Sequence, residues 1–200
     1  MSARRAPQVI VIAGPNGAGK TSSAPDLLRD TVGIDAFVNA DLVAEGLSGF
    51  RPEDTAVEAG RIMLARLKEL AGRRADFAFE STLSGRTLLG FLHRLAAKGF
   101  ECHIFYLWLP SVDLAVTRVR VRVKAGGHDV PESVIRRRFR KSLVNFDQVY
   151  RPLATMWRLY DASATVGRPL IAHGEAGHKP VIVDPQRWAL VRRQIEEEKP

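Results

Sequence analysis

The 200-residue sequence contains a single cysteine, Cys102, which excludes a disulfide within the chain. It also has no long apolar run: residues 104–110 are far too few to span a bilayer, and residues 9–13 are too few for a signal-peptide core. The five histidines are scattered, so no metal site of the Cys/His type is predicted. These absences favour a cytoplasmic protein that does not enter a membrane.

Acidic residues are fewer than basic ones, with 22 Asp and Glu against 30 Lys and Arg and a net charge of +8. Arginine accounts for 23 of the 30 cations, and guanidinium groups bind phosphate through two parallel hydrogen bonds. The composition therefore predicts an anionic partner, and nucleic acid, nucleotide and an anionic membrane surface all fit it. The apolar content of 46% excludes a mainly disordered, collagen-like or coiled-coil chain.

Apolar β-branched or aromatic runs alternate with segments of helical period, which predicts an α/β protein with a mostly parallel sheet flanked by helices. The length predicts a single domain over residues 1–200. Strands are predicted at 9–13, 36–39, 76–80, 101–109 and 157–161, and helices up to about 30 and at 52–73, 86–98, 111–124, 132–149 and from 185. Residues 169–184 fit a hairpin, so that a hairpin and a helix close the chain over about 165–197.

The strongest motif is Gly14-Pro-Asn-Gly-Ala-Gly-Lys-Thr21, which matches G-x-x-x-x-G-K-[ST] in full between an apolar strand and a helix. Its glycines allow successive N–H groups to point at the β-phosphate, and the helix N-terminus adds positive potential. Lys20 would neutralise the β- and γ-phosphates, and the Thr21 hydroxyl would hold Mg²⁺. The predicted site for ATP or GTP comprises Gly14, Pro15, Asn16, Gly17, Ala18, Gly19, Lys20, Thr21 and Ser22.

Two carboxylates follow neighbouring strands: Asp41 in Asn39-Ala40-Asp41, and Glu80. The carboxyl ends of parallel strands share one edge of the sheet, so both are predicted beside the phosphate-binding loop. Asp41 could accept a proton from an attacking hydroxyl, or it could cap the segment 42–47. Glu80 could assist Mg²⁺ or bind a substrate hydroxyl, together with the neighbouring donor Thr82, or it could cap a helix starting near Ser84.

Arginines fill two predicted helices around the turn 125–131, which together resemble a lid over about 118–140. An arginine that closes over a transferring phosphate stabilises its charge and excludes water. The candidates are Arg118, Arg122, Arg137 and Arg138, of which two or three are expected to point inward. His128 fits a turn residue better than a base or a metal ligand.

The ordered set of Gly14–Thr21, Phe37-Val-Asn-Ala-Asp41, Phe79-Glu-Ser-Thr-Leu-Ser-Gly85 and Gly126-Gly-His-Asp-Val-Pro131 resembles the zeta-toxin family of P-loop kinases. It is similar to the shorter branch with a Gly-Gly-His turn, whose members are often labelled predicted ABC-type ATPases. The resemblance covers about residues 8–163. It implies a kinase related to the toxins of toxin–antitoxin pairs, with an antitoxin as a protein partner. Better-studied members phosphorylate a sugar hydroxyl of UDP-N-acetylglucosamine.

The resemblance also implies roles for single residues. Asp41 corresponds to the general base, Lys20 and Thr21 to the phosphate and Mg²⁺ ligands, Glu80 and Thr82 to substrate contacts, and Arg122 with Arg137 or Arg138 to the lid arginines. Arg118 is a further candidate for substrate binding, and Glu80 for the metal. The sequence differs from the better-studied toxins at Ser84, where a substrate-binding arginine is expected.

Two other functions fit parts of the sequence. The charge of +8 suits a nucleic-acid-binding ATPase or a polynucleotide kinase, but no aromatic stacking platform accompanies the arginines. A nucleotide-dependent switch that binds a partner protein is the other alternative. The motifs favour the kinase of a small acceptor over both.

Overall fold

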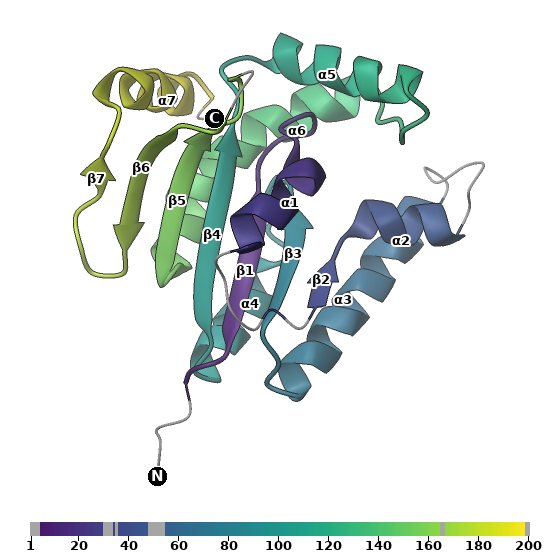
Figure 1. The fold of residues 1–200 in the computed structure, drawn as a ribbon, viewed down its shortest axis with the longest axis vertical. Coiled ribbons are helices and arrows are strands. Elements are labelled where there is room, and N and C mark those ends of the chain that lie inside the picture. Colours follow the sequence, from purple (N-terminus) through teal and green to yellow (C-terminus); the bar gives the residue numbers. More distant parts are fainter. Residues whose placement is uncertain (1–4, 30–33, 35, 48–54, 165–166, 199–200) are drawn as a thin grey trace.

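The computed structural model of the chain describes residues 5–29, 34, 36–47, 55–164 and 167–198. Within these ranges seven strands form one sheet in the order β2-β3-β1-β4-β5-β6-β7 (Figure 1). The strands are β1 Gln8–Ala13, β2 Ala36–Val38, β3 Phe77–Ser81, β4 Glu101–Trp108, β5 Met156–Asp161, β6 Leu170–Glu175 and β7 Val181–Ile182. The pairs among β1 to β5 are parallel, and β6 and β7 are added antiparallel at one edge.

Helices connect the parallel strands and cover both faces of the sheet. The α-helices are α1 Lys20–Arg29, α2 Ala40–Leu47, α3 Ala56–Gly72, α4 Leu89–Ala97, α5 Val112–Lys124, α6 Glu132–Asn145 and α7 Pro185–Glu197. A π-helical turn, η2 Phe146–Tyr150, and a 3₁₀ turn, η3 Arg151–Leu153, follow α6. None of the helices within the described ranges is both long and apolar enough to cross a lipid bilayer.

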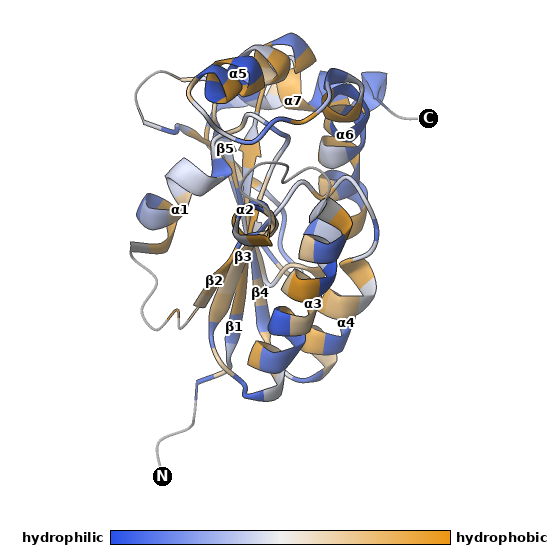
Figure 2. Cartoon of the chain, turned by 90° about the vertical axis from the view of Figure 1, so that its right-hand side faces the viewer, coloured by the Kyte–Doolittle hydropathy of each residue, from blue (hydrophilic) through white to orange (hydrophobic). Residues whose placement is uncertain are grey.

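The two faces of β1 belong to two hydrophobic clusters, as the alternation of side chains along a strand requires. Val9 and Val11 pack in the cluster that includes buried residues of α3, α4, η2 and α7. Ile10 and Ile12 face the other way, in the cluster with buried residues of α1 and α5. Figure 2 shows α1 on one side of the sheet and α3 and α4 on the other, with hydrophilic and hydrophobic residues alternating along α3. Residues 9–13 of β1 are fully buried and the strand is flanked by β3 and β4, so the loop that follows it is held at the middle of the sheet edge.

The predicted fold class is confirmed, including the antiparallel hairpin of β6 and β7. Two helix limits were wrong. α4 begins at Leu89 rather than at 86, because residues 86–89 form a separate turn, in which the amide of Leu89 donates to the carbonyl oxygen of Arg86. α6 ends at Asn145 rather than at 149, because the hydrogen-bond register changes there to a π-turn. The predicted start of α3 at 52–54 lies outside the described residues, and the single domain stays a prediction.

Candidate functional site

The loop between β1 and α1 is shaped by three glycines with positive φ, at +139° for Gly14, +78° for Gly17 and +75° for Gly19. A Cβ atom on Gly14 would lie 2.5 Å from the carbonyl oxygen of Leu107, and one on Gly17 would lie 2.6 Å from that of Ala115. The loop therefore lies directly against β4 and α5. It leads into the first turn of α1, whose N–H groups have no partner within the helix and can bind an anion.

Lys20 begins α1 and turns back over this loop. Its Nζ donates hydrogen bonds of 3.0 Å to the carbonyl oxygens of Gly14 and Pro15. Burial lowers the pKa of Lys20, although the carboxylates of Glu80 and Asp41 oppose this effect. The ammonium group thus sits among anionic side chains at the place that the motif predicts for phosphate.

Thr21, Asn39 and Glu80 form one hydrogen-bonded cluster at the ends of three neighbouring elements. Thr21 Oγ1 donates to Glu80 Oε2 at 3.1 Å, and Asn39 Nδ2 donates to Glu80 Oε1 at 3.0 Å. Burial raises the pKa of Glu80, against the opposing charge of Lys20. A hydroxyl and a carboxylate are oxygen donors of the kind that Mg²⁺ takes alongside phosphate oxygens, so the donor set fits this ion. The described residues contain no cluster of three or more His, Cys, Asp and Glu that could hold a metal by themselves.

Asp41 lies in the first turn of α2 and does not cap this helix. Asn39 is the cap: its Oδ1 accepts hydrogen bonds from the backbone N–H of Asp41 at 2.8 Å and of Leu42 at 3.4 Å. The alternative role of Asp41 as a cap is therefore wrong, and its exposed carboxylate is free to face the site. Glu80 is not a cap either, because its two oxygens accept from Thr21 and Asn39.

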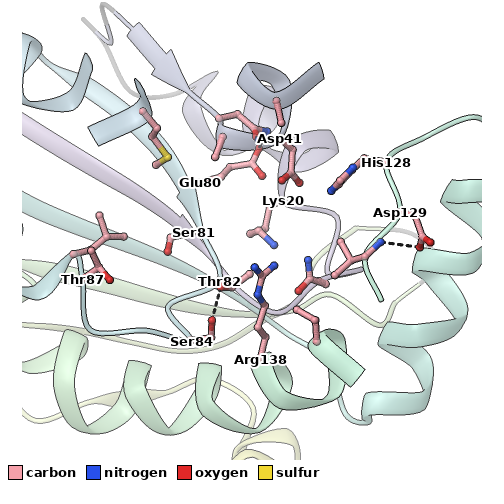
Figure 3. A pocket seen from close by; sticks show the side chains of 18 of the residues that line it. Lys20, Asp41, Glu80, Ser81, Thr82, Ser84, Thr87, His128, Asp129 and Arg138 are labelled. Carbon is pink, nitrogen blue, oxygen red and sulfur yellow. Dashed lines mark hydrogen bonds between the residues drawn. The ribbon is translucent and has the colours of Figure 1, made fainter. Parts of the chain in front are cut away.

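Two adjoining cavities meet at these residues. The nucleotide cavity, of about 340 Å³, is lined by the loop after β1 together with Arg118 and Arg122. The acceptor cavity, of about 490 Å³, is lined by polar residues of β3 and the following loop, by the turn after α5, and by apolar side chains of α2 and α3. Figure 3 shows Asp41, Glu80 and Lys20 close together on its wall, with Arg138 facing them. The residues that line both cavities are Asn16, Lys20, Asp41 and Glu80.

Three of the four lid arginines line a cavity. Arg118 and Arg122 line the nucleotide cavity, and Arg138 lines the acceptor cavity, where burial lowers its pKa against the opposing charge of Asp41. Arg137, which was proposed with Arg138, is exposed to solvent. Arginines at other positions hold the two helices together: Arg136 of α6 pairs with Asp113 of α5 at 2.9 Å.

Arg118 rests on a loop that the buried Asp161 holds in place. The guanidinium of Arg118 donates to the carbonyl oxygens of Ala162 at 2.6 Å and Ser163 at 3.1 Å. Asp161, at the end of β5, accepts from the N–H of Ser163 at 2.7 Å and from Arg187 Nε at 2.7 Å. The C-terminal helix α7 therefore fixes the loop on which Arg118 rests.

A second brace was missed by sequence reasoning. Ser142 donates to the carbonyl oxygen of Thr82 at 2.5 Å, Asn145 to that of Leu83 at 2.8 Å, and Tyr150 to that of Gly85 at 2.5 Å. These bonds hold the loop after β3, in which Leu83 is buried at a φ of +52°. The signal in the sequence was a serine at a core position of a helix, and Ser142 is indeed fully buried.

A family model described as "AAA domain" matches residues 9–147. The chain belongs to this AAA domain family. The match begins in β1 and ends within η2, so it includes the phosphate-binding loop, Asp41, Glu80 and all four lid arginines. It stops before Asp161 and α7.

Solved structures share the fold of this chain. A crystal structure of the AvrRxo1-ORF1:AvrRxo1-ORF2 complex with sulphate ions matches with a TM-score of 0.71 and 15% identity, over 97% of this chain and 77% of that one. The PezAT toxin–antitoxin system of Streptococcus pneumoniae matches with a TM-score of 0.63 and 14% identity, over 98% and 88%. A gluconokinase from Sinorhizobium meliloti matches with a TM-score of 0.52 and 17% identity, over 97% of both chains.

An uncharacterized protein of Haemophilus influenzae is a relative in sequence. It is 28% identical over 132 residues, which are 66% of this chain and 92% of that protein. The AvrRxo1 complex is also known with ATP, and that structure matches this AAA domain with a TM-score of 0.68 at 15% identity, over 97% of this chain and 77% of that one. These likenesses establish the P-loop fold, and the chemistry must be argued from the site.

Proposed function

We propose that the protein is a kinase that transfers the γ-phosphate of ATP or GTP to a hydroxyl group of a small acceptor, with Asp41 as the general base. One observation carries the proposal: Asp41 and Lys20 line the nucleotide cavity and the acceptor cavity alike. The carboxylate is thereby close to the boundary at which a γ-phosphate and an acceptor hydroxyl would meet.

The proposed reaction uses residues of both cavities. The acceptor hydroxyl gives its proton to Asp41, and its oxygen forms a bond to the γ-phosphorus. The bond from that phosphorus to the bridging oxygen breaks, and its electron pair stays on the nucleoside diphosphate. Lys20, Arg122 and Arg138 stabilise the charge on the transferring group. Mg²⁺, held by Thr21 and Glu80 together with the phosphates, would supply further positive charge.

We infer that the acceptor is a nucleotide sugar such as UDP-N-acetylglucosamine, as the resemblance to zeta toxins implies. The lining of the acceptor cavity supports a sugar, because it combines hydroxyl groups with apolar side chains that suit the two kinds of surface on a sugar ring. The hydroxyl groups are those of Ser81, Thr82, Ser84 and Thr87, and the apolar side chains include Met63, Leu64 and Leu88. Ser84 takes the place of the expected arginine, so contacts to a diphosphate must come from elsewhere.

The decisive experiment replaces Asp41 by asparagine. Transfer from labelled ATP to UDP-N-acetylglucosamine should fall at least about a hundredfold, the lower end of what general bases contribute. Binding of ATP, measured by titration calorimetry, should persist, because the phosphate-binding loop is unchanged. Glu45→Gln is the matched control: Glu45 lies one turn further along α2 and is exposed, so transfer should stay at the wild-type rate. Unchanged transfer by the Asp41→Asn variant would exclude this role, and transfer to a polynucleotide end would redirect the proposal.

We also propose a protein partner that restrains the kinase in the cytoplasm, where ATP is available. The support is the resemblance to toxins of toxin–antitoxin pairs, together with the fold shared with PezAT. Stable co-purification with a neighbour-encoded protein, which slows transfer when it is added back, is the expected result.

A further inference from the structure

The turn between α5 and α6 places His128 on the wall of the acceptor cavity. Gly126 has a φ of +85°, and a Cβ atom on Gly127 would lie 2.6 Å from Cγ of Arg122. Because Gly127 leaves this space, Arg122 packs against the turn and its Nη2 donates to the carbonyl oxygen of His128 at 2.7 Å. The backbone of His128 is thus held by an arginine that lines the nucleotide cavity.

The side chain of His128 turns into the acceptor cavity. Figure 3 shows its imidazole pointing into this space on the side of Asp41 and Lys20. The backbone of His128 is therefore held by Arg122, while its ring lies in the acceptor cavity. A residue that only shaped the turn would have no need of a polar ring at this position.

Buried polar atoms without a hydrogen-bond partner lie on residues around the two cavities. In the part of the chain that the structure describes, three buried side-chain atoms lack a partner: Asn16 Oδ1, Arg122 Nε and His128 Nδ1. All three residues line one or both of the cavities. Buried polar atoms in folded proteins are almost always hydrogen-bonded, so three unpartnered atoms on residues that line these two cavities point to a polar ligand.

We propose that His128 is an acceptor-binding residue whose imidazole hydrogen-bonds a hydroxyl group of a sugar or polyol, next to the oxygen that Asp41 deprotonates. This inference rests on the proposed kinase function. A neutral imidazole has one donor and one acceptor nitrogen, and a hydroxyl group likewise donates and accepts. A carboxylate such as that of Asp41 only accepts and Arg138 only donates, so neither can make both bonds. The imidazole therefore recognises the hydroxylated character of the acceptor.

The first test measures transfer kinetics of His128→Ala and His128→Gln. The acceptor is the one on which the wild type acts, chosen from UDP-N-acetylglucosamine, free sugars and polyols. His128→Ala should raise the acceptor KM about tenfold or more, as expected for a lost hydrogen bond to a desolvated group, while the Kd for ATP stays within about twofold. His128→Gln should recover part of the loss, because its amide both donates and accepts. The control is His178→Ala, at an exposed histidine in the β6–β7 turn, which should leave both constants unchanged.

The second test observes the imidazole itself. Among the ring signals of the five histidines, the one that His128→Gln lacks should shift when acceptor is added to the complex with a non-hydrolysable ATP analogue. Unchanged acceptor KM in His128→Ala would overturn the role of His128 and leave the kinase proposal standing. An equal loss of ATP and acceptor affinity would also overturn it, because the residue would then act through Arg122. A wild type that transfers phosphate to no acceptor overturns both proposals.

Discussion

Single glycines decide how closely the phosphate-binding loop can approach its neighbours. The backbone at Gly14 lies under the carbonyl oxygen of Leu107 in β4, and the backbone at Gly17 under that of Ala115 in α5. At both positions φ is positive, a region that other residues enter at a cost of about 1–3 kcal/mol. The loop is thereby fixed to one central strand and to the first lid helix.

Replacement of Gly17 by alanine should therefore damage both stability and binding. The added Cβ atom would lie 2.6 Å from a backbone oxygen that cannot move easily, so we expect unfolding to become easier by more than about 1 kcal/mol. ATP should bind at least about tenfold more weakly, since the N–H groups of the loop are displaced. Denaturant unfolding and ATP titration measure the two effects. Gly46→Ala in α2 meets nothing within 4 Å and should instead stabilise by about 0.5–1 kcal/mol, so equal effects of the two changes would contradict this account.

The sequence predicts most residues of the site but not the role that each of them plays. The P-loop motif locates Gly14 and Lys20 because it carries its own local geometry. In Asn39-Ala40-Asp41, however, either polar side chain can cap the next helix, and only the structure shows that Asn39 does so. His128 was treated as a turn residue because a turn sequence says nothing about which cavity its side chain enters.

Among the elements, α6 with its π-turn connects the lid to the loop after β3, which lines the acceptor cavity. Arg138, near the middle of α6, lines the acceptor cavity. Further along, Ser142, Asn145 and Tyr150 donate hydrogen bonds to the carbonyl oxygens of the loop after β3. Phe146 anchors the π-turn by stacking on Tyr106, with ring centroids 4.5 Å apart. The lid and the loop after β3 are thus both attached to α6 and its π-turn.

Loss of the Ser142 hydroxyl should loosen this connection. The hydroxyl of Tyr106 lies 2.8 Å from Ser142 Oγ, which in turn donates to the carbonyl oxygen of Thr82, so Ser142→Ala removes the partner of one buried and one partly buried group. We expect a loss of about 1–3 kcal/mol in the free energy of unfolding. The acceptor KM should rise while the Kd for ATP is unchanged, as checked by denaturant unfolding and steady-state kinetics. Ser133→Ala on the exposed side of α6 should change neither quantity; a similar effect there would point to a general weakening of the helix.

Helical period places α6 correctly, but it cannot predict the π-turn that follows. The spacing of Ile135, Phe139 and Leu143 continues to Phe146, so the sequence predicts one helix to about 149. The π-turn at 146–150 is packed through Phe146 against Tyr106 of β4 and Trp157 of β5. These contacts join residues far apart in the sequence, so no local pattern predicts them.

At the scale of the whole molecule, the site is a region where polar groups are held at some cost to stability. Burial shifts the pKa of Lys20, Glu80 and Arg138 toward their neutral forms, and three buried polar atoms there lack partners within the described residues. Charged groups kept in place before a ligand arrives commonly lower the stability of a protein. A bound nucleotide with its cation would satisfy several of them together.

Glu80→Gln tests this cost through the pH dependence of stability. Because burial raises the pKa of Glu80, the folded chain keeps the proton at pH values where the unfolded chain has lost it, and stability falls as pH rises from about 4.5 through the folded pKa. The variant lacks this titration, so its Tm should exceed that of the wild type at neutral pH and equal it below pH 4.5. Addition of ATP with Mg²⁺ should raise the Tm of the wild type more than that of the variant. A variant that is less stable at neutral pH would show that the carboxylate stabilises the free protein.

The central position of β4 limits how far the chain can be shortened. The family match ends at residue 147, yet β4 is bonded to β1 on one side and to β5 on the other. A fragment that stopped at the end of the match would expose the edge of β4 from His103 to Trp108, and such edges can join other chains into aggregates. It would also lose Asp161 and Arg187, which brace the loop under Arg118. A piece of the chain that keeps β4 covered and Arg118 braced therefore extends through α7.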